Sequence, residues 1–243
     1  MPEPATTIGS TDDPAFFSGI LQALAQRKNL SVAQAEAAFG SIMDGNVPPE
    51  RIAAFLMALR VRGETQDELL GAVTALRQRM YPVPNAPDNT IDVCGTGGDN
   101  YGTLNVSTAV AFVLAALGVP VAKHGNRAIS SLAGASDVLA ALCVPLSSNA
   151  EVLAEQLVRH HVVFMAAPHH HPAMRHAAGA RKVLALPTLF NLVGPMVNPL
   201  VSNASLWGFF PPSGSSPLRK CWPVWGRNAC GRSAASRRTG RAV

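Results

Sequence analysis

Short β-branched runs alternate with alanine-rich stretches along the middle of the chain, and this alternation constrains the fold more than any other feature. The runs at residues 91–94, 119–122 and 162–165 have the length and composition of strands, and the stretches between them have helical spacing. Strands that alternate with helices form a parallel sheet in an α/β domain, which we assign to residues 88–200. The expected helices cover residues 107–117, 137–142 and, after a cap formed by Ser148 with Glu151, residues 151–159.

The first eighty residues instead repeat apolar side chains at helical spacing, and short polar loops separate the repeats. Four short helices with apolar stripes form a small helical domain, which we place at residues 13–81. A polar leader at residues 1–12, expected to be disordered, precedes it, and a linker with Pro82, Pro84 and Pro87 follows it. The expected helix starts are Asp13 with Pro14, a capping box of Ser31 with Gln34, Pro48 with Pro49, and a capping box of Thr65 with Glu68.

Positive charge is concentrated at the end of the chain. Residues 201–243 contain six Arg, one Lys and no Asp or Glu, whereas residues 1–200 carry 13 bases and 15 acids. The last stretch has neither the strand nor the helix period, and its mixture of Ser, Gly, Pro and Arg is typical of disorder. We therefore treat residues 201–243 as an aberrant basic tail. The alkaline pI of about 9.4 comes from this tail and does not by itself indicate a polyanionic partner.

Three absences in the sequence limit the class of protein. The four Cys form no CxxC pair and have no spacing typical of zinc, so we expect neither a metal site nor a disulfide framework among them. The N-terminus has no basic region followed by an apolar one, which excludes a signal peptide. The longest apolar run, residues 109–122, is too short to span a bilayer and contains Gly118 and Pro120. These patterns predict a cytoplasmic protein without a membrane partner.

A glycine-rich stretch, CGTGGD at residues 94–99, directly follows the first expected strand. Glycines at this position let the backbone approach a phosphate closely, and Asn105, Ser107 and Thr108 place polar groups at the start of the next helix, where anions bind. The stretch predicts a phosphorylated ligand at the carboxyl edge of the sheet. The alternative is a glycine-rich turn with an ordinary helix cap. The spacing matches neither the Walker A nor the GxGxxG motif.

A second polar stretch, KHGNR at residues 123–127, follows the second expected strand, and Ser130, Ser131 and Gly134 come shortly after it. Two cations, a histidine and several hydroxyls at the end of a strand suit a diphosphate or a ribose phosphate. The alternative is a solvated polar loop, in which Arg127 could form a structural ion pair.

Several motifs occur in a fixed order: GTGGD with NVST, KHGNR with two serines, GASD, HPAMRHAAGARKVL and FNLVGPMVNP. Together they resemble the anthranilate phosphoribosyltransferase family over residues 13–199. The resemblance implies a helical domain that forms a homodimer, joined to an α/β domain of the nucleoside phosphorylase type. It implies transfer of phosphoribose from phosphoribosyl pyrophosphate to anthranilate, with Mg²⁺, in tryptophan biosynthesis. The products would be N-(5-phosphoribosyl)anthranilate and pyrophosphate.

The resemblance also assigns residues to ligands. It places anthranilate near Gly95, Asn126 and Arg181, where the Arg181 guanidinium would bind the carboxylate through two hydrogen bonds, and it makes Ser107 a magnesium contact. The reaction is a substitution at the anomeric carbon, which needs charge neutralisation and placement more than a strong base, so we assign no catalytic residue. The residues implied for phosphoribosyl pyrophosphate are Gly95, Gly98, Asp99, Thr103, Asn105, Val106, Ser107, Thr108, Lys123, His124, Gly125, Asn126, Arg127, Ser130, Ser131 and Ala135.

The chain departs from the family pattern at several points. Ala135 and Ser136 stand where the family commonly has Ser-Ala, so the serine that should touch the ligand is displaced or missing, and Pro187 replaces a common Arg. The three histidines at residues 169–171 could suggest a metal tract, but the resemblance makes them part of a loop over the substrate. The family continues beyond residue 199 with an acidic Asp-Glu pair that holds magnesium, whereas residues 201–243 contain no carboxylate.

We hypothesise that the tail is a frameshift product, because the codons of residues 221–226, read one nucleotide earlier, permit a family-like apolar helix that ends at a glycine. The shift would lie between about residues 201 and 213. We then expect an exposed apolar sheet edge and poor solubility or dependence on a partner. The coding DNA tests this: a single-base change should open a long family-like frame, and a sequence in which no such change does so contradicts the hypothesis.

Two other functions are compatible with parts of the sequence. A non-catalytic relative could hold nucleic acid through the basic tail and the cleft, with an affinity that falls steeply with salt. A nucleoside phosphorylase-like enzyme would share the fold, but the KHGNR and FNLVGP motifs argue against it. We therefore expect the phosphoribosyltransferase and treat nucleic acid as the alternative partner.

Overall fold

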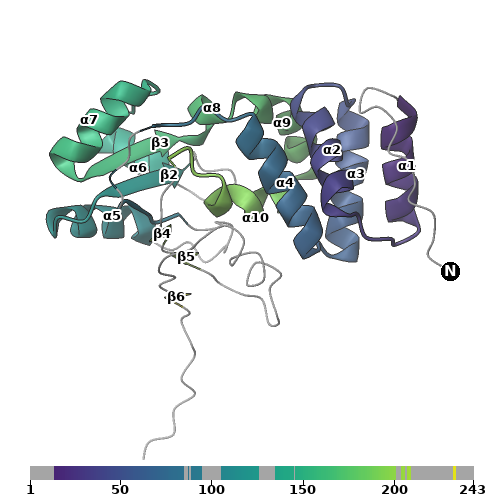
Figure 1. Ribbon diagram of the computed structural model, residues 1–243, viewed down its shortest axis with the longest axis horizontal. Helices are drawn as coiled ribbons and strands as arrows, with labels where there is room; N and C mark the ends of the chain where they lie inside the picture. Colours follow the sequence, from purple (N-terminus) through teal and green to yellow (C-terminus); the bar gives the residue numbers. More distant parts are fainter. Residues whose placement is uncertain are drawn as a thin grey trace, which may run out of the picture.

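The computed structural model describes residues 14–84, 87, 89–94, 105–125, 135–144, 146–200, 204–205, 207–208 and 232–233. Figure 1 shows a helical bundle at one end and a sheet with flanking helices at the other. The fold class expected from the sequence is confirmed. Within the described part of the chain, no helix is long and apolar enough to cross a membrane.

All four expected N-terminal helices are present. Both predicted capping boxes form, at Ser31 with Gln34 and at Thr65 with Glu68. Asp13, the predicted cap of the first helix, lies outside the described residues. The helices are α1 (Pro14–Ala25), α2 (Val32–Met43), α3 (Pro49–Arg62) and α4 (Gln66–Gln78).

Glu68 joins three of these helices through one buried carboxylate. Its Oε1 accepts a hydrogen bond from the Leu30 N–H before α2, at 2.9 Å. Its Oε2 accepts from the Thr65 N–H, at 2.9 Å, and forms an ion pair with Arg62 at the end of α3. A buried carboxylate is tolerated when its oxygens are paired in this way. The capping box therefore also fixes how α2, α3 and α4 meet.

The remaining helices and strands alternate along the chain. Helices α5, α6 and α7 were predicted from the sequence, and Asn149 caps α7 in place of the predicted Ser148, because its Oδ1 accepts from the N–H groups of Glu151 and Val152. The helices are α5 (Val106–Ala116), α6 (Ala135–Ala141), α7 (Ala150–His160), α8 (Ala167–His170), α9 (Arg175–Leu184) and α10 (Leu189–Val193), with 3₁₀ turns at Pro172–Met174 and Gly194–Met196.

The main sheet is parallel, with the order β3-β2-β1-β4. Its strands are β1 (Ile91–Asp92), β2 (Val121–Gly125), β3 (Val162–Ala166) and β4 (Ala204–Ser205). A separate parallel pair consists of β5 (Trp207–Gly208) and β6 (Arg232–Ser233). Because β4 pairs with β1, the sheet continues past the predicted boundary at residue 200.

Strand β2 begins and ends later than the predicted residues 119–122. The Val119 N–H bonds to the Leu114 carbonyl and so closes the end of α5 instead of joining the sheet, at 3.0 Å. Pro120 has no N–H to donate, but its carbonyl accepts from Ile91, at 2.9 Å. The strand then runs to Gly125, which takes the predicted ligand residues Lys123 and His124 into the sheet.

Helices cover both faces of the sheet. Ala122, Val163 and Met165 share one face with Leu153 and Leu157 of α7. The other face carries Val121 and Phe164, which pack with Ala111 of α5 and Leu139 of α6. A sheet buried on both faces explains why its strands are nearly continuous apolar runs in the sequence.

The helical layer contains a second, distant segment of the chain. Residues 175–197, which we had assigned to the α/β domain, pack into the core of α1–α4. Ala177 and Ala180 of α9 join that core, and the Phe190 ring of α10 meets the Phe39 ring edge-on, with centroids 5.5 Å apart. The sequence did not indicate this packing, because helical spacing identifies an apolar face but does not say against which layer it packs.

Helices α2 and α4 approach closely at Gly71. A Cβ atom at this position would lie 2.6 Å from the Ala35 Cβ and from the Val32 carbonyl oxygen. Only a residue without a side chain fits this contact, so the hydrogen on Gly71 sets the distance between the two helices.

Substituting Gly71→Ala should therefore destabilise the helical layer by about 1–3 kcal/mol, because the new methyl group meets backbone atoms that cannot move away. The matched control is Gly19→Ala in α1, where a Cβ meets nothing within 4 Å. Alanine there should stabilise the protein by up to about 1 kcal/mol. Urea unfolding of both variants measures the difference, and equal effects would contradict the close approach.

Candidate functional site

The residues predicted for the ligands fall into two groups in the structure. Among the described residues, Arg181 lies apart on α9, and the others lie at the carboxyl edge of the sheet or at the start of the helices that follow it: Asn105, Val106, Ser107, Thr108, Lys123, His124, Gly125 and Ala135. The predicted residues Gly95, Gly98, Asp99, Thr103, Asn126, Arg127, Ser130 and Ser131 lie outside the described residues.

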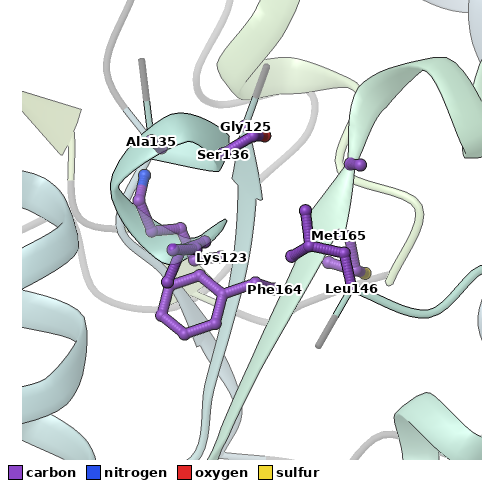
Figure 2. Close-up of a pocket in the computed structure, with 9 residues that line it drawn as sticks. Lys123, Gly125, Ala135, Ser136, Leu146, Phe164 and Met165 are labelled. Atoms are coloured by element: carbon purple, nitrogen blue, oxygen red, sulfur yellow. The ribbon is translucent and has the colours of Figure 1, made fainter. Parts of the chain in front are cut away.

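Lys123 is the central cation of the described group. Its side chain is only 4% exposed and lines a small pocket at the end of β2. Figure 2 shows the side chain running toward Ala135, at the start of α6. The rest of the pocket is mainly apolar and consists of Gly125, Ala135, Ser136, Leu139, Leu146, Phe164, Met165 and Ala166.

Ser136 belongs to this pocket and was not predicted as a ligand residue. It is buried beside Lys123 and follows Ala135 at the start of α6. The exchange of Ser-Ala for Ala-Ser therefore keeps a hydroxyl at the pocket. The departure from the family motif is visible in the sequence, but the sequence does not show that both positions line the pocket, because this depends on the orientation of α6.

The N-terminus of α5 offers backbone donors. Asn105 is the cap residue, and its carbonyl accepts from the N–H groups of Thr108 and Ala109, at 2.9 and 3.1 Å. The N–H groups of Val106 and Ser107 come before the first such donor and have no partner within the helix. The Thr108 hydroxyl is buried and has no hydrogen-bond partner in the described part of the chain. This helix end therefore suits an anion, as predicted from the sequence.

Asp92 is a buried carboxylate at the end of β1 that sequence reasoning read only as part of a strand. Its Oδ1 accepts from the His124 N–H, at 3.3 Å, and its Oδ2 lacks a hydrogen-bond partner among the described residues. Burial raises the pKa of Asp92 to about 6, against the opposing effects of the Asn198 amide and the Lys123 charge. The signal that could have identified it is a single acid in an otherwise apolar run that directly precedes the glycine-rich stretch CGTGGD.

Three imidazoles lie near the carboxyl ends of β2 and β3. The rings of His124 and His171 have centroids 5.2 Å apart. His171 bonds through Nε2 to the Val197 carbonyl, at 2.9 Å, and His170 bonds through Nδ1 to the Tyr81 carbonyl, at 3.2 Å. These contacts attach the segment after β3 to the linker and to the end of the helical layer.

The imidazoles of His124 and His171 are held neutral. Burial lowers the pKa of His124 to about 3, with the neighbouring His171 and His170 adding to the effect, and lowers the pKa of His171 to about 4. A neutral imidazole that donates from one nitrogen presents the other as an acceptor. The described residues contain no group of three or more His, Cys, Asp or Glu arranged to hold a metal ion.

Arg181 lies on α9, in the helical layer. Its guanidinium carbon is 5.4 Å from the centroid of the Phe190 ring, a distance typical of a cation–π contact. Burial lowers the pKa of Arg181. No described contact links it to the residues at the strand ends, so its role toward anthranilate stays a prediction.

The chemistry available at this edge is charge neutralisation. The site combines a buried ammonium, helix N–H groups and hydroxyls, which suit a polyanion. Cys94 offers no nucleophile, because burial raises the pKa of its thiol to about 12 and keeps it protonated. The neutral imidazoles supply hydrogen-bond acceptors without adding charge.

Replacing Asp92 with Asn should change how stability depends on pH. A raised folded-state pKa means that the folded protein holds the proton more tightly than the unfolded chain, so this stabilisation is present below pH 3.8 and is lost as the pH rises through about 6. Asp92→Asn removes this loss. As the pH rises from 4 to 7.5, the free energy of unfolding of the variant should therefore increase relative to that of wild type by up to about 3 kcal/mol. Urea unfolding at each pH measures this.

Asp67→Asn is the matched control, because Asp67 is an exposed carboxylate in the first turn of α4. If the two variants follow wild type in parallel across this pH range, the ionisation of Asp92 is not coupled to folding.

Comparison with known proteins supports the same family for both layers. The family model described as the glycosyl transferase family helical bundle domain matches residues 18–80, and the model of the a/b domain matches residues 87–221. The anthranilate phosphoribosyltransferase of Gluconobacter oxydans (strain 621H) is 55% identical over 196 residues, which cover 81% of this chain and 54% of that protein. Its counterpart in Afipia carboxidovorans is 50% identical over 194 residues, which cover 80% and 57%. The chain thus spans little more than half the length of these relatives.

Solved structures agree. The crystal structure of anthranilate phosphoribosyltransferase from Thermus thermophilus superposes with a TM-score of 0.80 at 37% identity, covering 88% of this chain and 66% of that one. The enzyme from Saccharomyces cerevisiae, in complex with PRPP and Mg, superposes with a TM-score of 0.74 at 26% identity, covering 83% and 60%. With the a/b domain model matching more than half of its residues, the chain belongs to this glycosyl transferase family, and its resemblance to the anthranilate phosphoribosyltransferases is confirmed.

Proposed function

We propose that this chain supplies the phosphoribosyl pyrophosphate site of an anthranilate phosphoribosyltransferase. The observation that carries the proposal is Lys123, a cation that is 4% exposed at the carboxyl end of a parallel strand. Burying an ammonium is costly unless an anion neutralises it. The nearby carboxylate of Asp92 is itself disfavoured in its charged form by burial, so the pocket around Lys123 suits an anionic ligand.

The relatives support a phosphoribosyl ligand. The Saccharomyces cerevisiae enzyme was solved with PRPP and Mg, and its fold covers most of this chain. In our proposal the diphosphate lies between Lys123 and the N-terminus of α5, where the N–H groups of Val106 and Ser107 face it. Gly125 and Ser136 complete the edge of that pocket.

Magnesium fits this arrangement as a metal held mainly by the substrate. Mg²⁺ prefers oxygen ligands and is usually bound through a few protein groups together with substrate phosphates. Ser107 offers a hydroxyl at the start of α5, whereas the described residues form no cluster that could hold the ion alone. When bound, the ion would neutralise charge on the diphosphate.

The proposed reaction needs little from the protein beyond placement and charge. The amine lone pair of anthranilate forms the new bond to the anomeric carbon, pyrophosphate leaves with the electrons of the bond that breaks, and the amine releases one proton. Lys123 and the N–H groups of α5 stabilise the leaving diphosphate. Arg181 is proposed to hold the anthranilate carboxylate. The homodimer and the cytoplasmic location implied by the resemblance remain predictions.

The variant Lys123→Met tests the diphosphate site. Removing a charge-assisted contact should weaken phosphoribosyl pyrophosphate binding, with Mg²⁺ present, by about 10- to 100-fold. Isothermal titration calorimetry measures the affinity, and Lys28→Met, at an exposed position after α1, is the control that should bind like wild type. Omitting Mg²⁺ should weaken wild-type binding as well.

Arg181→Lys separates the two substrates. It should leave phosphoribosyl pyrophosphate binding unchanged. It should raise the anthranilate concentration at which the reaction, followed as the loss of anthranilate fluorescence, reaches half of its maximal rate. A wild-type chain that binds no phosphoribosyl pyrophosphate, or a Lys123→Met variant that binds it as tightly as Lys28→Met, would overturn the proposed site.

A further inference from the structure

After its first turn, helix α5 is apolar on every side. Its sequence, VSTAVAFVLAA, contains no charged residue. One side packs on the sheet through Ala111, with Phe112 and Leu114 beside it. A helix that is apolar all round is normally covered on all sides, so the opposite side of α5 needs a partner surface.

That opposite side is exposed. Val106 and Val113 are each 60% exposed, and Leu117, just after the helix, is 74% exposed. Their spacing of seven and four residues places them on one face, and exposed Ala109 and Ala116 lie between them. We call these five residues the outer stripe of α5.

Helix α7, on the other face of the sheet, has the pattern of an ordinary surface helix, with an apolar inner side and a charged outer side. It buries Leu153 and Leu157 against the strands, and its outer side carries Glu151, Glu155 and Arg159. The exposed apolar residues there are Val158, at 65%, and Val152, at 38%, and the charged residues lie among them. Single exposed apolar residues are ordinary, whereas a continuous stripe indicates an interaction surface.

The lengths of the relatives indicate what the stripe binds. The matched stretch reaches only 54% of the Gluconobacter oxydans protein and 57% of the Afipia carboxidovorans protein. In the described part of this chain, β4 pairs on one side only, with β1. Among the described residues, the sheet thus has an open edge at β4 and α5 has an exposed apolar side, in a domain whose relatives have substantially more chain.

A second copy of the chain fits less well. Helix α5 has 11 residues and is therefore about 16 Å long. A stripe of this length presents much less than the roughly 800 Å² per partner that a standard stable interface buries. Completion of the α/β domain would cover the stripe and extend the sheet at the same time.

We propose that the outer stripe of α5 is the docking surface for the polypeptide that follows the matched stretch in the relatives. The occupant is that polypeptide as a separate chain, and it presents an apolar face to Val106, Val113 and Leu117. This inference concerns assembly of the domain and does not depend on the transferase activity.

Co-production tests the docking surface. The full chain is produced with a tagged polypeptide that corresponds to the part of the Gluconobacter oxydans protein after its matched stretch, and the amount of chain recovered on the tag is measured without substrates. Val113→Lys should lower the recovery at least about tenfold, because docking would bury an unpaired ammonium. Val158→Lys is the matched control, since it changes an equally exposed valine on α7, and should leave recovery unchanged.

The outcomes are distinct. Equal recovery of both lysine variants, or no recovery of the wild-type chain, overturns the proposal. A wild-type homodimer that Val113→Lys dissociates, measured by light scattering without the tagged polypeptide, would make a second copy the occupant and also overturns it. Circular dichroism checks that each variant folds, and Val113→Thr, which keeps the shape and removes apolar surface, decides the question if the lysine variant does not.

Discussion

Asn198 holds the helical layer and the sheet together, and the candidate site depends on that junction. Its buried side-chain amide donates to the Ala122 carbonyl in β2, at 2.9 Å, and its Oδ1 accepts from the Leu200 N–H, at 2.8 Å. The flanking carbonyls of Val197 and Pro199 accept from His171 and Val83. Buried backbone must be paired in this way where it passes between layers. One short stretch thereby positions the linker, the end of β2 and the segment after β3.

Charge at the site is governed by burial more than by ion pairing. Burial keeps His124, His171 and Cys94 uncharged, and it raises the pKa of Asp92 despite the nearby Lys123. The arrangement favours an anionic ligand, and His124, His171 and Cys94 are poorly suited to proton transfer, because a general acid or base works best with a pKa near the operating pH. That preference agrees with a reaction whose main demand is stabilisation of a departing diphosphate.

Local signals in the sequence predicted a large part of the fold. The capping boxes at Ser31 and Thr65 and the parallel strands follow from short-range chemistry, and the structure confirms them, whereas α7 is capped by Asn149 and not by the predicted Ser148. The sequence did not reveal that residues 175–197 join the helical core, because layer membership depends on contacts between distant segments. Asp92 and Ser136 were missed for a related reason, since their importance comes from neighbours on other elements.

The helical layer is built from two stretches of chain that are far apart in sequence, and this affects the order in which it can form. The Arg77 guanidinium donates to the Met196 carbonyl across 119 positions, at 2.9 Å. During synthesis, helices α1–α4 leave the ribosome long before α9 and α10 exist to close their core. Contacts between residues so far apart in the sequence slow folding. Until α9 and α10 have been made, the apolar surface of α1–α4 is open to aggregation. The N-terminal helices therefore cannot complete their fold until the intervening sheet strands have been made.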